Sequence, residues 1–244
     1  MKKKLPSHGQ MSEAFLTAAF LSASGGLQDA YTYLTRGSVF ANAQTGNIVL
    51  LSESLFAKNW HTTLRYLVPL LSFALGVAAA EMIRHFCRKM TAGWADRQRQ
   101  CDRRTRRFHR FFEGRLHWRQ LVLMLEVLLL FFVGFLPESL NLPANALVSF
   151  SCAMQVQAFR KVNGYSFAST MCIGNIRSGV ESLCACRITH NRQDFSKALH
   201  YFGIIFFFAL GAGVGSRLIL VLGLRAIWVS CLLLLAGFIL MLIP

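Results

Sequence analysis

The sequence predicts an all-α, polytopic membrane protein with about eight apolar segments in two internal repeats. Hydrophobic residues make up 54% of the 244 residues, and charged residues only 15%. Several apolar runs approach the roughly 20 residues that a helix needs to cross a bilayer. A polar, glycine-containing stretch inside this apolar sequence occurs twice, at 25–55 and at 153–183. We therefore expect one membrane domain over residues 1–244, with six to eight spans.

The apolar segments divide the chain into two halves. The first half contains segments 14–34, 39–57, 64–86 and 121–136, and the second contains 144–158, 167–186, 199–222 and 227–243. Gly46-Asn47-Ile48 matches Gly174-Asn175-Ile176, and the sequence Phe-Ala-Leu-Gly at 73–76 recurs at 208–211. Repeat one therefore spans 14–136 and repeat two spans 144–243, with a linker at 137–143, and each repeat has one segment interrupted by a Gly-Asn pair.

Basic residues are concentrated in one stretch. Of the 26 Lys and Arg residues, 12 lie between residues 84 and 119. Basic loops stay on the cytoplasmic side and contact anionic lipid headgroups, so we expect 84–119 to be a cytoplasmic loop. RNA binding by its Arg-rich run is a weaker alternative. Four full crossings in each half would make the repeats parallel, and three would make them inverted; we favour the parallel arrangement.

Polar side chains in the two repeated stretches form the candidate substrate site. Bilayer hydrocarbon cannot hydrogen-bond such groups, and polar, glycine-broken segments at matching places in two halves indicate a substrate site. The first half contributes Gln28, Asp29, Asn42, Gln44, Thr45, Gly46 and Asn47, and the second contributes Gln155, Gln157, Thr170, Gly174 and Asn175.

Asp29 is the candidate coupling carboxyl, because it follows Gly25-Gly26, a pair that can break a helix inside an apolar segment. The alternative is an aspartate that binds backbone groups freed by that break. The Gly-Asn pairs are typical of an unwound segment that feeds a half-helix, whose free N–H groups suit an anion or a carbonyl. The alternative there is a plain helix N-cap formed by Asn47 or Thr45.

The remaining ionisable groups in apolar segments have simpler interpretations. We expect Glu53 and Glu181 near the membrane surface, with Glu181 paired to Arg177 one turn earlier. Glu126 follows Arg119, and we expect an ion pair at the surface there. Cys184 and Cys186 lack the usual spacing of a zinc site, so we expect no metal. No enzyme motif is present, and we expect neither catalysis nor a cofactor.

The first polar stretch resembles the signature of the YoaK-like bacterial membrane proteins, a family of unknown function. The matching residues are Gly26, Asp29, Ala30, Tyr33, Leu34, Gly37, Phe40, Ala41, Asn42, Thr45, Gly46 and Asn47. The family's later motif is matched by Gln155, Gln157, Gly164, Thr170 and Gly174, although Gln157 replaces the usual Asn and Ile173-Gly174-Asn175 replaces the usual Thr-Gly-Thr. The resemblance covers nearly the whole chain. It implies a multi-pass protein of the bacterial inner membrane, often described as a permease.

These observations together predict a secondary transporter or permease for a small polar solute, driven by protons, with its site between the two repeats. One alternative is a non-transporting scaffold or regulator that acts through the basic loop. Another is a membrane enzyme that acts on a lipid, although Asp29 and nearby amides alone would have to supply its chemistry. Either a monomer or a homo-oligomer fits the sequence.

Overall fold

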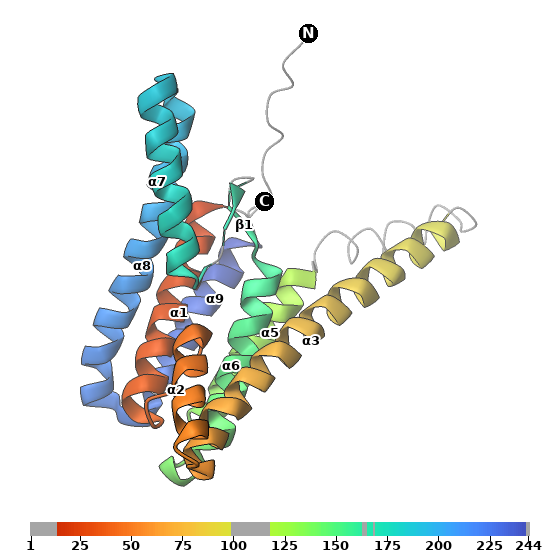
Figure 1. The fold of residues 1–244 in the computed structure, drawn as a ribbon. Coiled ribbons are helices and arrows are strands. Elements are labelled where there is room, and N and C mark those ends of the chain that lie inside the picture. Colours follow the sequence, from red (N-terminus) through yellow and green to blue (C-terminus); the bar gives the residue numbers. More distant parts are fainter. Residues whose placement is uncertain (1–13, 99–117, 163–164, 168, 243–244) are drawn as a thin grey trace.

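The computed structural model describes residues 14–98, 118–162, 165–167 and 169–242. Most of these residues are helical, which confirms the all-α class. The helices are α1 (Phe15–Thr35), α2 (Gln44–Phe56), α3 (Trp60–Gln98), α5 (Trp118–Val133), α6 (Asn141–Ala158), α7 (Cys172–Thr189), α8 (Arg192–Leu222) and α9 (Ile227–Leu240). Short 3-10 turns η2 (Glu138–Leu140) and η3 (Gly223–Ala226) precede α6 and α9, and β1 (Lys161–Val162) pairs with β2 (Tyr165–Ser166) in a small hairpin. Figure 1 shows a helical bundle from which α3 slants away and α7 projects.

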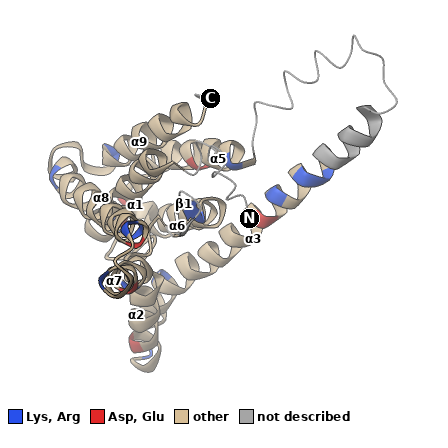
Figure 2. Ribbon diagram, turned by 90° about the horizontal axis from the view of Figure 1, so that it is seen from above, with Lys and Arg blue, Asp and Glu red and all other residues tan. Residues whose placement is uncertain are grey.

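Two helical stretches, Trp60–Met90 and Arg192–Leu240, are long and apolar enough to cross a membrane. The first is part of α3, which runs on to Gln98 and so extends beyond the apolar segment 64–86. The basic stretch 84–119 therefore begins as helix, and its residues 99–117 lie outside the described residues. Figure 2 shows Lys and Arg following one another along the outer part of α3, whereas most of the bundle carries little charge.

Helix α1 is continuous, and the expected break at Gly25-Gly26 is wrong. The two glycines instead allow other chain segments to approach closely. A Cβ atom on Gly26 would lie 2.0 Å from the carbonyl oxygen of Phe208 in α8. Small residues permit such short distances between helix backbones, so here the glycine serves packing rather than unwinding.

Matching helices of the two halves make matching contacts. Helix α1 packs on α8, and its counterpart α6 packs on α3. Helix α2 packs on α3, and its counterpart α7 packs on α8. Helix α1 also packs on α9, and α6 correspondingly packs on α5. The glycine of each Phe-Ala-Leu-Gly sequence lies at a crossing. A Cβ atom on Gly76 would lie 2.3 Å from the Phe150 carbonyl oxygen. A Cβ atom on Gly211 would lie 2.0 Å from the Ala23 carbonyl oxygen. The third helix of each half thus packs against the first helix of the other half.

The first helices of the two halves run in opposite directions. The end of α1 contacts the start of α6, because Asn145 Nδ2 donates to the Arg36 carbonyl oxygen at 2.7 Å. Earlier in α1, the Leu21 carbonyl oxygen accepts from Gln155, near the end of α6. This antiparallel pairing contradicts the parallel arrangement of the halves that we favoured from charge. Figure 1 shows both helices in the centre of the bundle.

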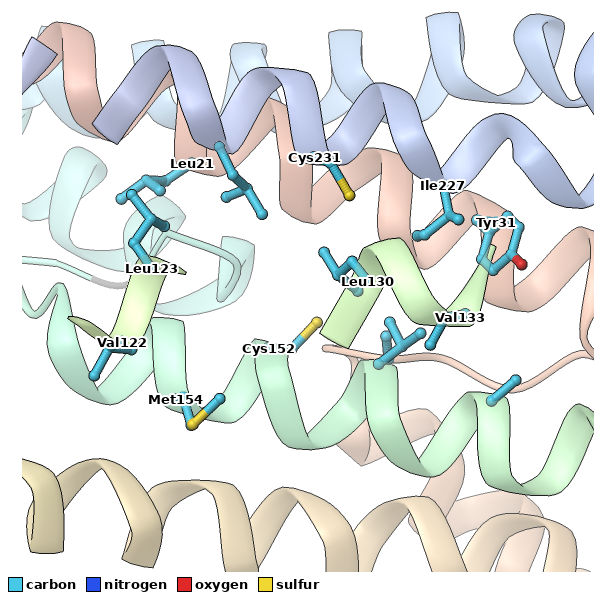
Figure 3. Close-up of a cluster of buried hydrophobic side chains, with 14 of the residues drawn as sticks. Leu21, Tyr31, Val122, Leu123, Leu130, Val133, Cys152, Met154, Ile227 and Cys231 are labelled. Carbon is cyan, nitrogen blue, oxygen red and sulfur yellow. The ribbon is translucent and has the colours of Figure 1, made fainter. Parts of the chain in front are cut away.

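The apolar core lies where α1, α5, α6 and α9 meet (Figure 3). Figure 3 shows Leu21 of α1 beside Leu123 of α5, and Tyr31 of α1 beside Ile227 of α9, and all four are fully buried. Polar groups are enclosed within this same region, and they form the candidate site.

Candidate functional site

Two extended segments fold back along α1 before the following helices begin. After α1, residues 36–43 return along the helix until the Asn42 N–H donates to Asp29 Oδ1 at 2.7 Å. The Asn42 side chain also donates to the Gly25 carbonyl oxygen at 3.2 Å. The second segment follows the hairpin, and Ser22 Oγ donates to the Ser169 carbonyl oxygen at 2.5 Å. Helices α2 and α7 therefore begin beside α1, and their starts are only partly buried, since Ala43 and Met171 just before them are exposed.

The two segments meet at Gly25. A Cβ atom on this residue would lie 2.3 Å from Thr170 Cγ2 and 3.7 Å from Asn42 Nδ2. Gln155 of α6 closes the group, because its Nε2 donates to Ser169 Oγ at 3.0 Å. We call these residues the Gly25 site: Gly25, Asp29, Asn42, Gln155, Ser169 and Thr170.

Three polar atoms of the Gly25 site have no hydrogen-bond partner within the described part of the chain. They are Asn42 Oδ1, Gln155 Oε1 and Thr170 Oγ1, and all three are buried. An unsatisfied buried polar group costs about 1–3 kcal/mol, so native proteins rarely leave several together without water or a ligand. Two acceptors and a hydroxyl from different segments are suited to bind a small solute that carries hydrogen-bond donors.

Asp29 anchors the first returning segment. The Asn42 amide donates to its carboxylate at 2.7 Å. This amide lies just before α2, where we expected an anion or a carbonyl of a ligand, and it is thus occupied by a carboxylate of the protein itself. This arrangement agrees with the alternative that Asp29 binds backbone, except that the backbone belongs to a loop and not to a broken helix.

Asn47 holds this loop from the other side. It lies buried in the first turn of α2, where its Oδ1 accepts from the Phe40 N–H at 3.0 Å and its Nδ2 donates to the Phe40 carbonyl oxygen at 2.7 Å. Gln44 Oε1 accepts a further bond from Asn47 Nδ2 at 3.0 Å. The N-cap position is Ala43, without a side-chain cap, so the alternative of an N-cap formed by Asn47 or Thr45 is wrong.

The other predicted site residues lie further from Gly25. Asn175 is buried in the first turn of α7, as Asn47 is in α2. Gly46 is half-buried, and Thr45 and Gly174 are exposed. Gln157 donates to Glu81 of α3, away from the Gly25 site. The structure thus brings together Asp29, Asn42, Gln155 and Thr170 from the predicted set.

A second polar cluster joins α1, α5 and α9. Gln28 Nε2 donates to Ser24 Oγ and Ser230 Oγ, both at 3.0 Å, and approaches Glu126 Oε1 at 3.4 Å. Cys152 of α6 donates to Gln28 Oε1. Glu126 is fully buried, and its Oε2 has no partner among the described residues.

The expected surface ion pair of Glu126 with Arg119 is therefore wrong. Helix α5 begins at Trp118, three residues before the apolar run from which we predicted the segment, and this places Glu126 near the middle of the helix. If the segment is counted from Trp118, the sequence alone places the Glu126 carboxyl group near its middle. The predicted pair of Arg177 and Glu181 is confirmed, with Nε and Oε1 2.9 Å apart on the surface.

The fold and its centre define an all-helical protein with helices able to cross a membrane and buried polar groups between them. Residues 17–240 match the family described as "Protein of unknown function (DUF1275)", and the chain belongs to that family. This membership agrees with the predicted resemblance to an uncharacterised family. No curated protein and no solved structure matches the chain.

Proposed function

We propose that this protein is a multi-pass secondary transporter or permease of the bacterial inner membrane, and that the Gly25 site binds its substrate, a small polar solute. One observation supports this proposal above the others. Asn42 Oδ1, Gln155 Oε1 and Thr170 Oγ1 are buried and unpartnered among the described residues. Asn42 and Thr170 approach Gly25 of α1, and Gln155 bonds to Leu21 of α1 and to Ser169, next to Thr170. A transporter needs polar groups inside the membrane that a passing solute can satisfy.

Membrane embedding and internal repeats are part of this proposal. Large apolar side chains stand exposed on the outside of the bundle, among them Phe56 at 88%, Leu220 at 77% and Val221 at 82%. Exposed apolar surface of this kind suits contact with lipid. The first helix of each half packs on the third helix of the other half, α1 on α8 and α6 on α3, and α1 and α6 run antiparallel. Both observations support inverted repeats. In transporters of that design, interrupted segments from both halves meet at the substrate site near the midplane.

Two buried carboxyl groups are candidates for proton coupling. Asp29 is the choice from sequence, but the backbone amide of Asn42 holds its carboxylate in the structure. Glu126 Oε2 has no hydrogen-bond partner in the described residues, and Glu126 Oε1 accepts from Gln28 of α1. Among the described residues, Cys152 and Cys231 are ionisable groups near Glu126. We assign the coupling role to Glu126 and the role of loop anchor to Asp29.

Thermal stabilisation by a library of small polar metabolites, measured on the purified protein at two pH values, tests the substrate site. A bound solute raises the melting temperature by linkage. The critical variant is Thr170→Val, which keeps the methyl group beside Gly25 and removes a hydroxyl that has no described partner. The control is Thr45→Val, on an exposed threonine of α2.

We expect stabilisation of the wild type and of Thr45→Val by the same compound, and at least roughly tenfold weaker binding by Thr170→Val, from the loss of one hydrogen bond. Equal binding by both variants would remove the Gly25 site from the proposal. If no compound stabilises the wild type, the protein is better explained as a scaffold or regulator that acts through its basic stretch.

A further inference from the structure

A pocket separate from the Gly25 site opens where α1 ends. Its volume is about 290 Å³, at the low end for small-molecule sites, which run to roughly 1,000 Å³. The end of α1, the start of α3, η2 and the start of α6 form its walls. The polar lining residues are Arg36, His61, Arg65, Glu138, Ser139, Asn141 and Asn145.

Charges of opposite sign line this pocket without neutralising each other. Within the described part of the chain, neither Arg65 nor Glu138 forms an ion pair or a side-chain hydrogen bond. Gly37, at φ 85°, lies beside Arg65, and a Cβ atom there would be in ordinary van der Waals contact with Arg65 Cζ at 3.8 Å. The pocket therefore offers the Arg65 guanidinium and the Glu138 carboxylate to a ligand, next to the Arg36 guanidinium that is bound within the protein.

The floor of the pocket adds an unused acceptor. Asn145 is 1% exposed, and its Nδ2 donates to the Arg36 carbonyl oxygen at 2.7 Å. Its Oδ1 has no partner among the described residues. Arg36 itself is committed to the protein, because its guanidinium donates to Tyr31, Asn141 and the carbonyl oxygens of 133, 136 and 137. Its role is to fix the wall of the pocket.

We propose that this pocket binds a small zwitterion, a molecule with a carboxylate and an ammonium group on neighbouring carbons. Arg65 would bind the carboxylate, since guanidinium groups pair well with planar oxyanions. Glu138 and Asn145 Oδ1 would accept from the ammonium group, which has three donors and no acceptor. A simple anion would leave Glu138 and Asn145 unsatisfied, and a simple cation would leave Arg65 unsatisfied. The inference concerns binding alone, so it does not depend on whether the protein transports a solute through the Gly25 site.

The test compares matched probes on the purified full-length protein by isothermal titration calorimetry. The zwitterions are L-alanine and L-leucine. The probes that lack the amine are propionate and 4-methylpentanoate, and the probes that lack the carboxylate are ethylamine and isopentylamine. The variants are Arg65→Gln and Glu138→Gln, with Arg225→Gln as the control, because Arg225 is an exposed arginine of η3 outside the pocket.

We expect at least one of the two amino acids to bind, its amine-free and carboxylate-free analogues to bind roughly tenfold more weakly or not at all, and both pocket variants to lose binding by a similar factor. Arg225→Gln should bind as the wild type does. Binding of propionate as tight as that of L-alanine would show an anion site and overturn the proposal, as would amino-acid binding that survives in both pocket variants or no binding of either amino acid. Binding that is lost in Thr170→Val but kept in both pocket variants would place the amino acid at the Gly25 site instead.

Discussion

Asn42 and Thr170 come from different halves of the chain and approach the same residue of α1, Gly25. A Cβ atom on that glycine would lie 3.7 Å from Asn42 Nδ2 and 2.3 Å from Thr170 Cγ2. The site is therefore built by two extended segments that reach the middle of one continuous helix. This geometry leaves backbone and side-chain polar groups inside an apolar bundle, where they are retained at a cost in stability.

The close contact of α1 with α8 depends on Gly26. We expect Gly26→Ala to destabilise the protein by about 1–3 kcal/mol or more, because the added methyl group would meet the α8 backbone, which has little room to move. Gly213 of α8 is the matched control, since a Cβ atom there would meet nothing within 4 Å.

Gly213→Ala should leave the melting temperature unchanged or raise it, because alanine is favoured over glycine in a helix by about 1 kcal/mol. Thermal unfolding of the two purified variants makes the comparison. Equal melting temperatures would mean that α1 and α8 do not pack as described.

Arg36 joins the end of α1 to the turn after α5. Its side chain is fully buried and is held by the Tyr31 hydroxyl and by carbonyl oxygens around the end of α5. We expect Arg36→Lys to lower stability by about 3 kcal/mol, because lysine has three donors on one nitrogen and cannot reach all these acceptors.

Tyr31→Phe should cost less, about 1–2 kcal/mol, since it removes one acceptor and leaves the carbonyl contacts in place. The double variant tests the coupling of the two residues by comparing the sum of the single effects with the combined effect. Full additivity in thermal unfolding would argue against the contact between the hydroxyl and the guanidinium.

The two buried carboxyl groups should respond differently to neutral replacements. Asp29→Asn replaces the carboxylate that accepts from the Asn42 backbone N–H, and we expect it to lower stability by about 1–3 kcal/mol. Glu126→Gln keeps the size of the side chain and its contact with Gln28, so stability should change by less than about 1 kcal/mol.

If Glu126 couples the proton, uptake by Glu126→Gln should no longer depend on a pH gradient, while its folding is intact. Melting temperatures and uptake with and without a gradient distinguish the two residues. A stable Asp29→Asn variant that alone loses the pH dependence would return the coupling role to Asp29.

Sequence patterns predicted the helices well, because apolar runs of sufficient length are strong local signals. Segments 14–34, 144–158 and 227–243 lie within one to three residues of α1, α6 and α9 at either end. The sequence also identified four residues of the Gly25 site, since polar side chains in apolar surroundings stand out: Asp29, Asn42, Gln155 and Thr170.

Two features, the role of Gly26 and the direction of the second half, depended on tertiary packing and were not predictable from local patterns, whereas the burial of Glu126 was missed although the sequence contained the signal. Gly26 has the same sequence signature whether it breaks a helix or lets α8 approach, and only the position of α8 decides between them. Glu126 was assigned to the surface because the start of α5 was placed at the first purely apolar residue. The direction of the second half was inferred from the distribution of basic residues among loops. That distribution is a statistical bias, and it contains no information on the antiparallel pairing of α1 and α6.

Uptake into proteoliposomes tests the central claim most directly. Vesicles with wild type, Thr170→Val, Thr45→Val or no protein are incubated with an isotope-labelled bacterial metabolite extract under an imposed pH gradient, and their contents are measured by mass spectrometry. The account predicts that at least one small polar metabolite accumulates with the wild type and Thr45→Val, and falls to the level of empty vesicles with Thr170→Val. Accumulation by Thr170→Val equal to that of the wild type, or no accumulation by the wild type, would contradict it.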